Sequence, residues 1–259
     1  MQDKTTKVLI GLSGAKGRMC AAVARATNCS PRFSIAFGVD RQSDTNNESF
    51  PIYSDFQSLP KCDVIIDFSS PSLTTLALSY AVQTRTPIVV ATTGQTSDNL
   101  QFIETASKSI PVFFDSNTSL GNCLLLKLVR TAAAFLDDSF DIEIVETHHR
   151  IKKDSPSGTA LSLANAVITA KEETFGKEYT TCFGHLQKRE GRQIGLHSIR
   201  GGTVVGKHEV LFLGDDERLT LTHEVENKSV FVHGALKAAE FLLDKHSGLY
   251  NMNDLQTKI

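Results

Sequence analysis

The sequence lacks several features that mark specialised classes of protein. Its five cysteines form no CxxC pair and have no histidine spacing typical of zinc sites, so we expect reduced core residues and no metal. No stretch approaches the roughly 20 consecutive apolar residues of a transmembrane helix. The polar N-terminus lacks the long apolar core of a signal peptide. We therefore expect a cytoplasmic protein with no membrane partner.

The sequence also lacks a long basic run, and its net charge is −2. This composition predicts no nucleic-acid partner. No internal repeat or low-complexity segment interrupts the chain. With 259 residues, of which 41% are hydrophobic, the chain is long enough for one large or two modest domains.

Strand-like and helix-like segments alternate over the first 115 or so residues. The strand-like runs are apolar throughout and are bounded by turn residues, which is typical of a parallel sheet covered on both faces. They lie at residues 7–12, 33–40, 62–69, 86–94 and 110–115, and helical patterns lie between them at 17–27, 72–84 and 96–109. This part of the chain is predicted to be a Rossmann-like, doubly wound α/β domain.

The pattern changes after about residue 119. A helix pattern leads into a strand in which Ile142 and Ile144 alternate with Asp141 and Glu143, as expected for a strand with one wet face. Next come a helix from about 156 to 170, an antiparallel meander over 194–226 and a closing helix over 234–245. We therefore predict an α+β domain at 120–229, inserted into a first domain made of residues 1–119 and 230–259.

A glycine-rich loop lies between the first strand and the first helix. Gly11, Gly14 and Gly17 follow one another at intervals of three. Such glycines let the backbone approach a pyrophosphate, whose charge is stabilised by the N-terminus of the following helix. A tight turn without a ligand would explain the loop equally well on its own.

Three other segments favour a nicotinamide dinucleotide. Asp40 ends the second strand, where a carboxylate can accept both ribose hydroxyls, and the adjacent Arg41 can engage a 2′-phosphate. The pair is therefore compatible with NADH or NADPH, although solvated charges at a strand end are the alternative. The loops at 91–95 and 115–122 are expected at the carboxyl ends of later strands, where they would line a nicotinamide pocket.

Cations gather ahead of a helix in the segment 143–160. His148 and His149 end a strand, Lys152 follows, and Ser155 is predicted as an N-cap with Pro156 at the first helical position. The segment Ser157, Gly158 and Thr159 would then present unpaired N–H groups as an anion site. Together these groups predict a pocket for a small substrate with more than one carboxylate; a solvated charged loop is the alternative.

This segment resembles the signature of the dihydrodipicolinate reductase family, a pattern of the form E-[IV]-x-E-x-H-x-x-x-K-x-D-x-P-S-G-T-A. The matching positions are Glu143, Glu146, His148, Lys152, Asp154 and Pro156 to Ala160. The resemblance extends over nearly the whole chain, through "GAKGRM", "DVIIDFSSP", "TTG", "HSIRGGTVVGKHEV", "ERLTLTH" and "GLYNM".

The resemblance implies a function. Members of the family use NADH or NADPH to reduce the cyclic product of aspartate semialdehyde and pyruvate, on the route to diaminopimelate and lysine. It implies that His148 and Lys152 are the catalytic acid pair, that His149 contacts the substrate, and that Gly158 and Thr159, beside Ser157, bind a substrate carboxylate. It also implies a homotetramer built through the sheet of a substrate-binding and oligomerisation domain.

The same resemblance, with the motifs above, assigns the dinucleotide to a set of residues in the first domain. These are Gly14, Ala15, Lys16, Gly17, Arg18, Met19, Asp40, Arg41, Ala91, Thr92, Thr93, Asp115, Ser116, Asn117 and Thr118.

Three positions depart from the family pattern. Cys20 stands where a third loop glycine is usual, and Ala91 stands where the loop "GTTG" begins with glycine; both side chains are small enough to preserve close packing. In "GNC" the asparagine, Asn122, stands one place earlier than usual.

Two other functions remain open. Another two-domain dehydrogenase of amino-acid metabolism, such as an aspartate or homoserine dehydrogenase, would share the first domain but would not need the cations before "PSGT". A protein that senses NAD(P) without chemistry would use Gly14, Gly17 and Asp40 and leave His148 and Lys152 idle.

Overall fold

The computed structural model describes residues 7–46, 49–184, 188–189 and 191–255. The polar N-terminal residues 1–6 lie outside the described part. The chain divides into two compact units, and the first is formed by residues 1–119 together with 229–259. The second unit is the continuous segment 120–228.

Unit 1 contains a seven-stranded parallel sheet with the order β12-β6-β5-β4-β1-β2-β3. Its strands are β1 Val8–Ser13, β2 Phe33–Val39, β3 Ile52–Tyr53, β4 Val64–Asp67, β5 Ile88–Val90, β6 Pro111–Phe114 and β12 Gly248–Tyr250. Chain order reverses between β1 and β4, as it does at the ligand-binding point of doubly wound folds. The predicted Rossmann-like class is confirmed; the short strands β3 and β12 were not anticipated.

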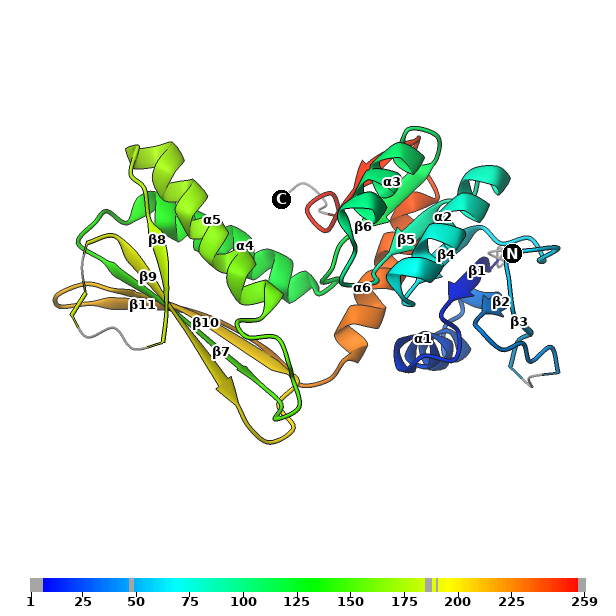
Figure 1. The fold of residues 1–259 in the computed structure, drawn as a ribbon, viewed down its shortest axis with the longest axis horizontal. Helices are drawn as coiled ribbons and strands as arrows, with labels where there is room; N and C mark the ends of the chain where they lie inside the picture. The colour runs from blue at the N-terminus through cyan, green and yellow to red at the C-terminus, as the bar shows by residue number, and fades with distance from the viewer. Residues whose placement is uncertain (1–6, 47–48, 185–187, 190, 256–259) are drawn as a thin grey trace, which may run out of the picture. The chain divides into compact units, whose positions relative to one another are not determined.

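Helices cover both faces of this sheet (Figure 1). They are α1 Arg18–Asn28, α2 Pro71–Thr84, α3 Ser97–Ser107 and α6 Ser229–Leu242. Helix α1 buries Cys20, Val23 and Thr27, which recur at helical spacing. It packs beside α6, while α2 and α3 pack together. The last helix, α6, also contacts β4, β5 and β6, so the end of the chain belongs to the first unit.

Unit 2 contains a mixed five-stranded sheet with the order β11-β10-β7-β9-β8. Its strands are β7 Asp141–His148, β8 Thr180–Phe183, β9 Gln193–Arg200, β10 Gly206–Leu213 and β11 Arg218–Val225. Only part of the predicted meander is correct: β10 and β11 form an antiparallel pair. Strand β7 lies between β9 and β10, and β7 pairs with β9 in parallel, because the chain crosses over through a helix between them.

Helices α4 Leu120–Phe135 and α5 Gly158–Phe175 pack together in unit 2. Strand β7 alternates strictly between buried and partly exposed residues. Its buried Ile142 and Ile144 join Leu163 and Val167 of α5 in one hydrophobic core. This core fixes the face of β7 that turns toward α5, and therefore also fixes where the end of the strand points.

Lys171 is a charged residue inside this helical layer, and it is fully buried. Its Nζ donates hydrogen bonds of 2.7 and 3.0 Å to the carbonyl oxygens of Leu136 and Asp137, at the end of α4. The ammonium also lies over the rings of Phe175 and Tyr179. Lys171 therefore satisfies two backbone carbonyl groups in the segment that directly follows α4.

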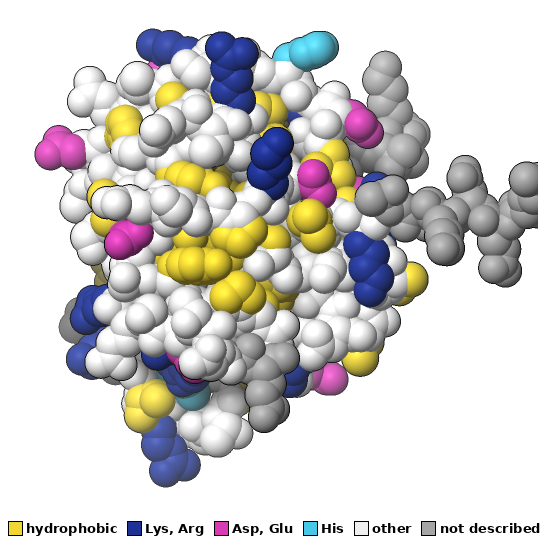
Figure 2. All heavy atoms as spheres, turned by 90° about the vertical axis from the view of Figure 1, so that its right-hand side faces the viewer, with side chains coloured by type: hydrophobic (Ala, Val, Ile, Leu, Met, Phe, Trp, Pro, Cys, Tyr) yellow, Lys and Arg dark blue, Asp and Glu magenta, His cyan; other side chains and the backbone are white. Residues whose placement is uncertain are grey.

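The cysteines agree with the sequence-based expectation only in part. Cys20 and Cys123 are buried, but Cys29 is exposed, so the expectation of core residues is wrong for Cys29. Figure 2 shows a face on which apolar side chains gather near the centre, while basic side chains lie apart rather than in one patch. All five cysteines are free thiols. Within the described ranges, no helix is long and apolar enough to cross a membrane.

Replacing Lys171 with methionine should destabilise the protein. The variant keeps an unbranched apolar side chain but leaves the carbonyl groups of Leu136 and Asp137 without their donor. Unsatisfied buried acceptors cost about 1–3 kcal/mol. Chemical denaturation followed by circular dichroism measures the loss.

The matched control for this prediction is Lys177→Met, which removes a partly exposed ion pair with Asp138. Such pairs contribute at most about 1 kcal/mol. Equal losses of unfolding free energy in the two variants would contradict the prediction, because Lys171 would then contribute no more than an exposed ion pair.

Candidate active site

The glycine loop of unit 1 is shaped by close backbone contacts. Gly14 has a φ of +81°, and a Cβ at this position would lie 2.8 Å from the carbonyl oxygen of Phe68. Only glycine fits there. Gly17 is the N-cap of α1, and no side chain of the described residues caps this helix. The first N–H groups of α1, from Arg18 and Met19 onward, therefore suit an anionic ligand such as a pyrophosphate.

Not every glycine of the loop serves this purpose. A Cβ on Gly11 would lie 2.6 Å from the ring of Phe37, so Gly11 permits packing inside the sheet. Cys20, one of the departures from the family pattern, is fully buried, and its thiol contacts the carbonyl oxygen of Ser13 at 3.3 Å. A small side chain is therefore accommodated there, as expected.

Asp40 lies directly after β2 and is connected to the glycine loop. Its two carboxylate oxygens accept hydrogen bonds from the backbone N–H groups of Lys16, at 2.8 Å, and Arg41, at 2.7 Å. The N–H groups of Gly14 and Ala15 both donate to the carbonyl oxygen of Val39. The end of β2 and the loop after β1 are thus held together as one surface.

A buried carboxyl group, Asp67, organises the ends of the next two strands. Its oxygens accept hydrogen bonds from the hydroxyl groups of Ser69, of Thr74 at 2.6 Å and of Thr92 at 2.7 Å. The hydroxyl of Thr92 also accepts the N–H of Ser69 at 2.8 Å. Burial raises the pKa of Asp67, and the hydroxyl hydrogen bonds oppose that rise.

The loops predicted to line the nicotinamide pocket follow β5 and β6. Ala91 and Thr92 are buried, whereas Thr93 is exposed. After β6, Asp115 accepts the N–H groups of Asn117 and Met252, and Thr118 donates to the carbonyl oxygen of Phe231 at 2.7 Å. Ser116 is exposed. The side chains of Thr92 and Thr118 are therefore engaged within the protein, which leaves Thr93, Ser116 and the backbone to face a ligand.

In unit 2, the predicted site lies at the end of β7 and is built on Glu146. This side chain is 1% exposed. Its Oε1 accepts hydrogen bonds from the Ser157 N–H at 3.1 Å, the Ser198 hydroxyl at 2.7 Å and the Arg200 guanidinium at 2.7 Å. Its Oε2 accepts from Arg200 at 2.9 Å and is bonded to Nδ1 of His148.

These hydrogen bonds decide the charge of Glu146. Burial would raise the pKa of the carboxyl group, but the hydrogen bonds from Arg200, Ser198 and His148 outweigh it and lower the pKa to about 2. Glu146 is therefore an anion at every physiological pH, and it is the acceptor of each of its hydrogen bonds.

His148 lies next to Glu146 on the same face of β7. Burial lowers its pKa, the Glu146 charge opposes this, and the charges of Lys152 and Arg200 add to the lowering. A Cβ on Gly206 would lie 3.0 Å from its Nε2, so glycine leaves the space that this nitrogen faces. The ring of His208 packs against it edge to face, with the two centroids 5.1 Å apart.

The two other predicted cations differ in their surroundings. Lys152 donates to both carboxylate oxygens of Asp154, at 2.9 and 2.7 Å, and its side chain is 20% exposed. His149 is half-buried, and its Nδ1 has no hydrogen-bond partner among the described residues. The structure thus places His148 at the end of β7 and His149 and Lys152 in the segment that follows it.

The start of the following helix differs from the prediction. The N-cap of α5 is Ser157 rather than Ser155, because the Ser157 hydroxyl accepts the N–H of Ala160 at 3.2 Å. Pro156 therefore precedes the helix. The expectation of an unpaired N–H at Ser157 is also wrong, since this group donates to Glu146.

The rest of the predicted anion site lies at the start of α5. The Ser157 hydroxyl shares a 3.0 Å hydrogen bond with Nε2 of His208, and the residue is 2% exposed. Gly158 is exposed, and a Cβ there would meet no described atom within 4 Å. Gly158 thus faces open space, while the side chain of Ser157 is held inside the protein.

Glu146, His148 and His208 offer ligand-type atoms that lie within 4.8 Å of one another. This group does not fit a metal ion, because the guanidinium of Arg200 already occupies both oxygens of Glu146. A second cation there would be repelled. The cluster is an ion-pair network rather than a metal site.

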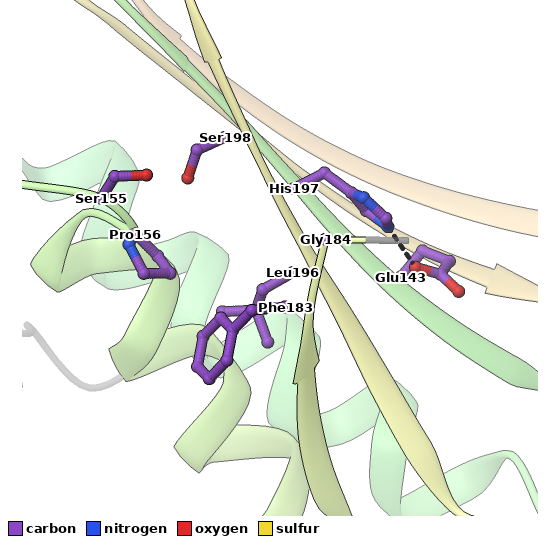
Figure 3. Close-up of a pocket in the computed structure, with 8 residues that line it drawn as sticks. All are labelled: Glu143, Ser155, Pro156, Phe183, Gly184, Leu196, His197 and Ser198. Atoms are coloured by element: carbon purple, nitrogen blue, oxygen red, sulfur yellow. Dashed lines mark hydrogen bonds and ion pairs between the residues drawn. The ribbon is translucent and has the colours of Figure 1, made fainter. Parts of the chain in front are cut away.

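Figure 3 shows a separate pocket of about 860 Å³ in unit 2. It is lined by Glu143, Ser155, Pro156, Phe183, Gly184, Leu196, His197 and Ser198. The dashed line in the figure joins His197 Nε2 to Glu143 Oε2, at 2.7 Å. His148 and Lys152 are not among the residues that line this pocket, so the pocket is separate from the predicted catalytic residues.

Sequence reasoning missed several residues of this network. Glu146 belongs to the signature but received no role, although the alternation of β7 places it on the buried face with His148. A charged residue on a buried face was the available signal. Ser198, Arg200 and His208 lie in the segment "HSIRGGTVVGKHEV" of the resemblance but received no role, because the sheet register alone sets them beside β7.

The two units together define a class of protein. A parallel sheet of this order, with a glycine loop after its first strand and a carboxylate after its second, is the architecture of dinucleotide-dependent oxidoreductases. The second unit carries a buried Glu–His pair beside the N-terminus of a helix.

Comparison with known families is more specific. Residues 8–118 match the family model described as dihydrodipicolinate reductase, N-terminus, and residues 121–255 match the model of its C-terminus. The chain belongs to the dihydrodipicolinate reductase family.

Relatives and a solved structure agree with this assignment. The chain is 42% identical over 251 residues to a 4-hydroxy-tetrahydrodipicolinate reductase of Caldanaerobacter subterraneus, covering 95% of this chain and 97% of the relative. It is 39% identical over 255 residues to the Clostridium novyi enzyme of that name, covering 96% and 98%. A dipicolinate-bound dihydrodipicolinate reductase from a Paenisporosarcina species shares the fold, with a TM-score of 0.77, 22% identity and coverage of 96% and 99%.

The charge of Glu146 should make the stability of the protein depend on acid pH. Its pKa is about 2 in the folded protein, against an ordinary value of 4.5. A lowered pKa contributes stability above the unfolded value, and this contribution is lost as the pH falls toward the folded value. In Glu146→Gln, the free energy of unfolding should therefore change less between about pH 4.5 and pH 2 than it does in the wild type.

Urea denaturation at a series of pH values measures this difference. Other acidic groups titrate in both proteins, so they cancel in the comparison. Parallel curves for the two proteins would contradict the assigned ion pair.

Proposed function

We propose that this protein catalyses the reduction of 4-hydroxy-tetrahydrodipicolinate to tetrahydrodipicolinate by NADH or NADPH, in the pathway to diaminopimelate and lysine. Membership of the family over nearly the whole chain carries this proposal. It is supported by the cations gathered at the start of α5, beside a helix N-terminus that faces open space.

Unit 1 would bind the dinucleotide. The pyrophosphate would lie against the loop Gly14 to Gly17 and the first turn of α1. The backbone around position 14 has no room for a side chain, so this position requires glycine. Asp40 would accept ribose hydroxyl groups. The segments Ala91 to Thr93 and Asp115 to Thr118 would face the nicotinamide, which supplies the hydride when it is bound.

Unit 2 would bind the dicarboxylate substrate. One carboxylate would accept N–H groups and the hydroxyl at Gly158 and Thr159, with Ser157 holding this turn in place. His149, whose Nδ1 has no described partner, would contact the substrate. The relative from Paenisporosarcina was solved with dipicolinate, which is a small cyclic dicarboxylate of the same kind.

His148 and Lys152 would complete the reaction. The 4-hydroxy substrate would first lose its hydroxyl group as water to give a conjugated imine. Hydride transfer to that imine leaves a carbanion-like centre that needs a proton. Both groups can carry a proton at a defined atom, Nε2 of His148 and Nζ of Lys152. A bound dianion would favour the protonated form of His148.

Neither alternative from the sequence explains this arrangement as well. A protein that only senses NAD(P) has no use for a buried Glu146–His148 pair. An aspartate or homoserine dehydrogenase would not require the sequence of His148, Lys152 and Gly158, and the family models match neither class.

The partners follow from the same proposal. The small dicarboxylate is the substrate, and neither nucleic acid nor a membrane takes part. A homotetramer would form through the partly exposed face of the unit 2 sheet, and the enzyme would act in the cytoplasm.

One assay tests the function directly. The substrate is generated in situ from aspartate semialdehyde and pyruvate by the condensing enzyme, and the protein is then added. Loss of the reduced nicotinamide absorbance is expected; no consumption of either NADH or NADPH would reject the proposal.

Arg41 should set the preference between the two cofactors. Only NADPH carries a 2′-phosphate that a guanidinium can pair with. Arg41→Ala should therefore raise the KM for NADPH more than the KM for NADH. Steady-state kinetics with each cofactor measures both values, and equal changes would move the phosphate contact elsewhere.

His148 and Lys152 should be needed for the chemical step. His148→Gln should lower kcat by about 10²- to 10⁴-fold with little change in affinity for NADH, which is the range of general acid catalysis. Lys152→Arg should also lower kcat, because a guanidinium is too weak an acid to donate the proton. The double variant should lose much less than the product of the single losses.

Binding of NADH, followed by its fluorescence, is the control for both variants. A kcat near the wild-type value in both His148→Gln and Lys152→Arg would contradict a catalytic role and would leave these residues only the role of attracting the substrate electrostatically.

A further inference from the structure

We infer that Glu146 is a positioning residue for His148: its carboxylate holds the proton of the imidazole on Nδ1 and leaves Nε2 as the nitrogen that exchanges a proton with the substrate. The inference rests on the proposed reductase function. It concerns a residue that does not itself touch the reacting atoms.

The hydrogen-bond pattern determines which atom carries the proton. Glu146 is buried, and its oxygens accept three hydrogen bonds at Oε1 and two at Oε2. A carboxylate that is ionised has no hydrogen to donate. The hydrogen of the Glu146–His148 bond must therefore belong to Nδ1, and in the neutral ring Nε2 has a free lone pair.

The position of Nε2 agrees with this assignment. It faces Gly206, where the missing side chain leaves space, with the closest approach of a built Cβ at 3.0 Å. The N–H of Gly201 donates to the backbone carbonyl of His148 at 3.0 Å and fixes the backbone there. Nδ1 of the imidazole is thus held by the Glu146 carboxylate, while Nε2 lies beside the backbone of Gly206, where no side chain blocks it.

The groups that face His148 come from four segments. Glu146 lies on its own strand, Arg200 on β9, His208 on β10, and Lys152 on the turn after β7. Burial lowers the pKa of His208 to about 4, with a further contribution from the charge of His148. Of these groups, only Glu146 favours the protonated form of His148, since Arg200 and Lys152 are cations and His208 is neutral at neutral pH.

The same carboxylate also fixes the turn that carries the other site residues. It accepts the N–H of Ser157 directly, at 3.1 Å. Through Arg200, which donates to the carbonyl oxygen of Asp154 at 2.8 Å, it holds the segment that follows Lys152. Glu146 therefore connects the acid, the lysine turn and the start of α5.

The substitution Glu146→Gln tests the charge with little change of shape. Three donors converge on Oε1, so the amide oxygen should take that position and the amide nitrogen should face His148. Nδ1 would then become an acceptor and the ring would change tautomer. We expect kcat to fall about 10²- to 10⁴-fold, with the dissociation constant for NADH unchanged.

The pH profile gives a readout that a structural role would not move. Losing an adjacent negative charge lowers the pKa of His148, because Glu146 favours the protonated imidazole. Activity that requires protonated His148 is lost as the pH rises through this pKa. The high-pH limb of the kcat profile should therefore move to lower pH in Glu146→Gln.

Glu146→Asp separates charge from packing. It retains the charge but shortens the side chain, whereas glutamine retains the shape but loses the charge. We expect Glu146→Asp to have a kcat at least tenfold higher than that of Glu146→Gln and a high-pH limb nearer to the wild type. The opposite order would assign Glu146 a packing role only and would overturn the inference.

The matched control is Glu143→Gln. Glu143 lies on the same strand and is likewise paired with an arginine, Arg189 at 3.0 Å, and a histidine, His197 at 2.7 Å. Its side chain occupies the opposite face of β7. Glu143→Gln should keep the wild-type kcat and pH profile, with its assembly state checked by gel filtration.

A measurement on the wild type needs no variant to fold. Nitrogen-15 spectra of histidine-labelled protein distinguish the two tautomers, and His148→Gln identifies the signal of His148. The Nδ1–H tautomer at neutral pH is expected; the Nε2–H tautomer would overturn the inference. Absence of turnover in the wild type would reject the reductase function instead, so the two failures are distinguishable.

Discussion

The buried ion pair of Glu146 with Arg200 is the interaction on which the second unit depends. A buried carboxylate is costly unless its lone pairs are satisfied. Here the donors come from β7, from β9 and from the N-terminus of α5, with Arg200 donating to both oxygens. Each donor is in place only if the strands have the observed register, in which Glu146 is opposite Ser198 and His148 is opposite Arg200. One charge therefore links the register of the sheet to the geometry of the candidate site.

Much of the first unit could be predicted from the sequence because its signals are local. Apolar strands bounded by turn residues alternate with helices, and glycines between the first strand and helix need only a short segment to be read. The two serines around Pro156 show the limit of this approach. Both are good N-cap residues, and proline at the first helical position favours Ser155. The hydrogen bond from the Ser157 N–H to Glu146 favours Ser157 as the N-cap, and Glu146 lies eleven residues earlier in the sequence.

The second unit was less predictable because strand order is a long-range property. Strands separated by Gly-rich turns suggest a meander, and this is correct for β10 and β11. Nothing local indicates that β7 lies between β9 and β10. The same limitation hid Arg200 and His208, which reach the site only through that order. By contrast, the period-two pattern of Ile142 and Ile144 extends to Glu146 and His148, so a buried Glu–His pair was within reach of the sequence.

Several of the positive or titratable groups around the end of β7 are held by a partner or kept neutral by burial. Among the described groups, Arg200 is neutralised by Glu146, Lys152 is paired with Asp154, and burial keeps His148 and His208 neutral near pH 7. What the pairs provide is placement, since each charged group is held by a partner at a fixed distance. A dianion would have to replace Asp154 as the ion-pair partner of Lys152. Because Asp154 is largely exposed, water could solvate its carboxylate after this replacement, and no buried charge would lose its partner.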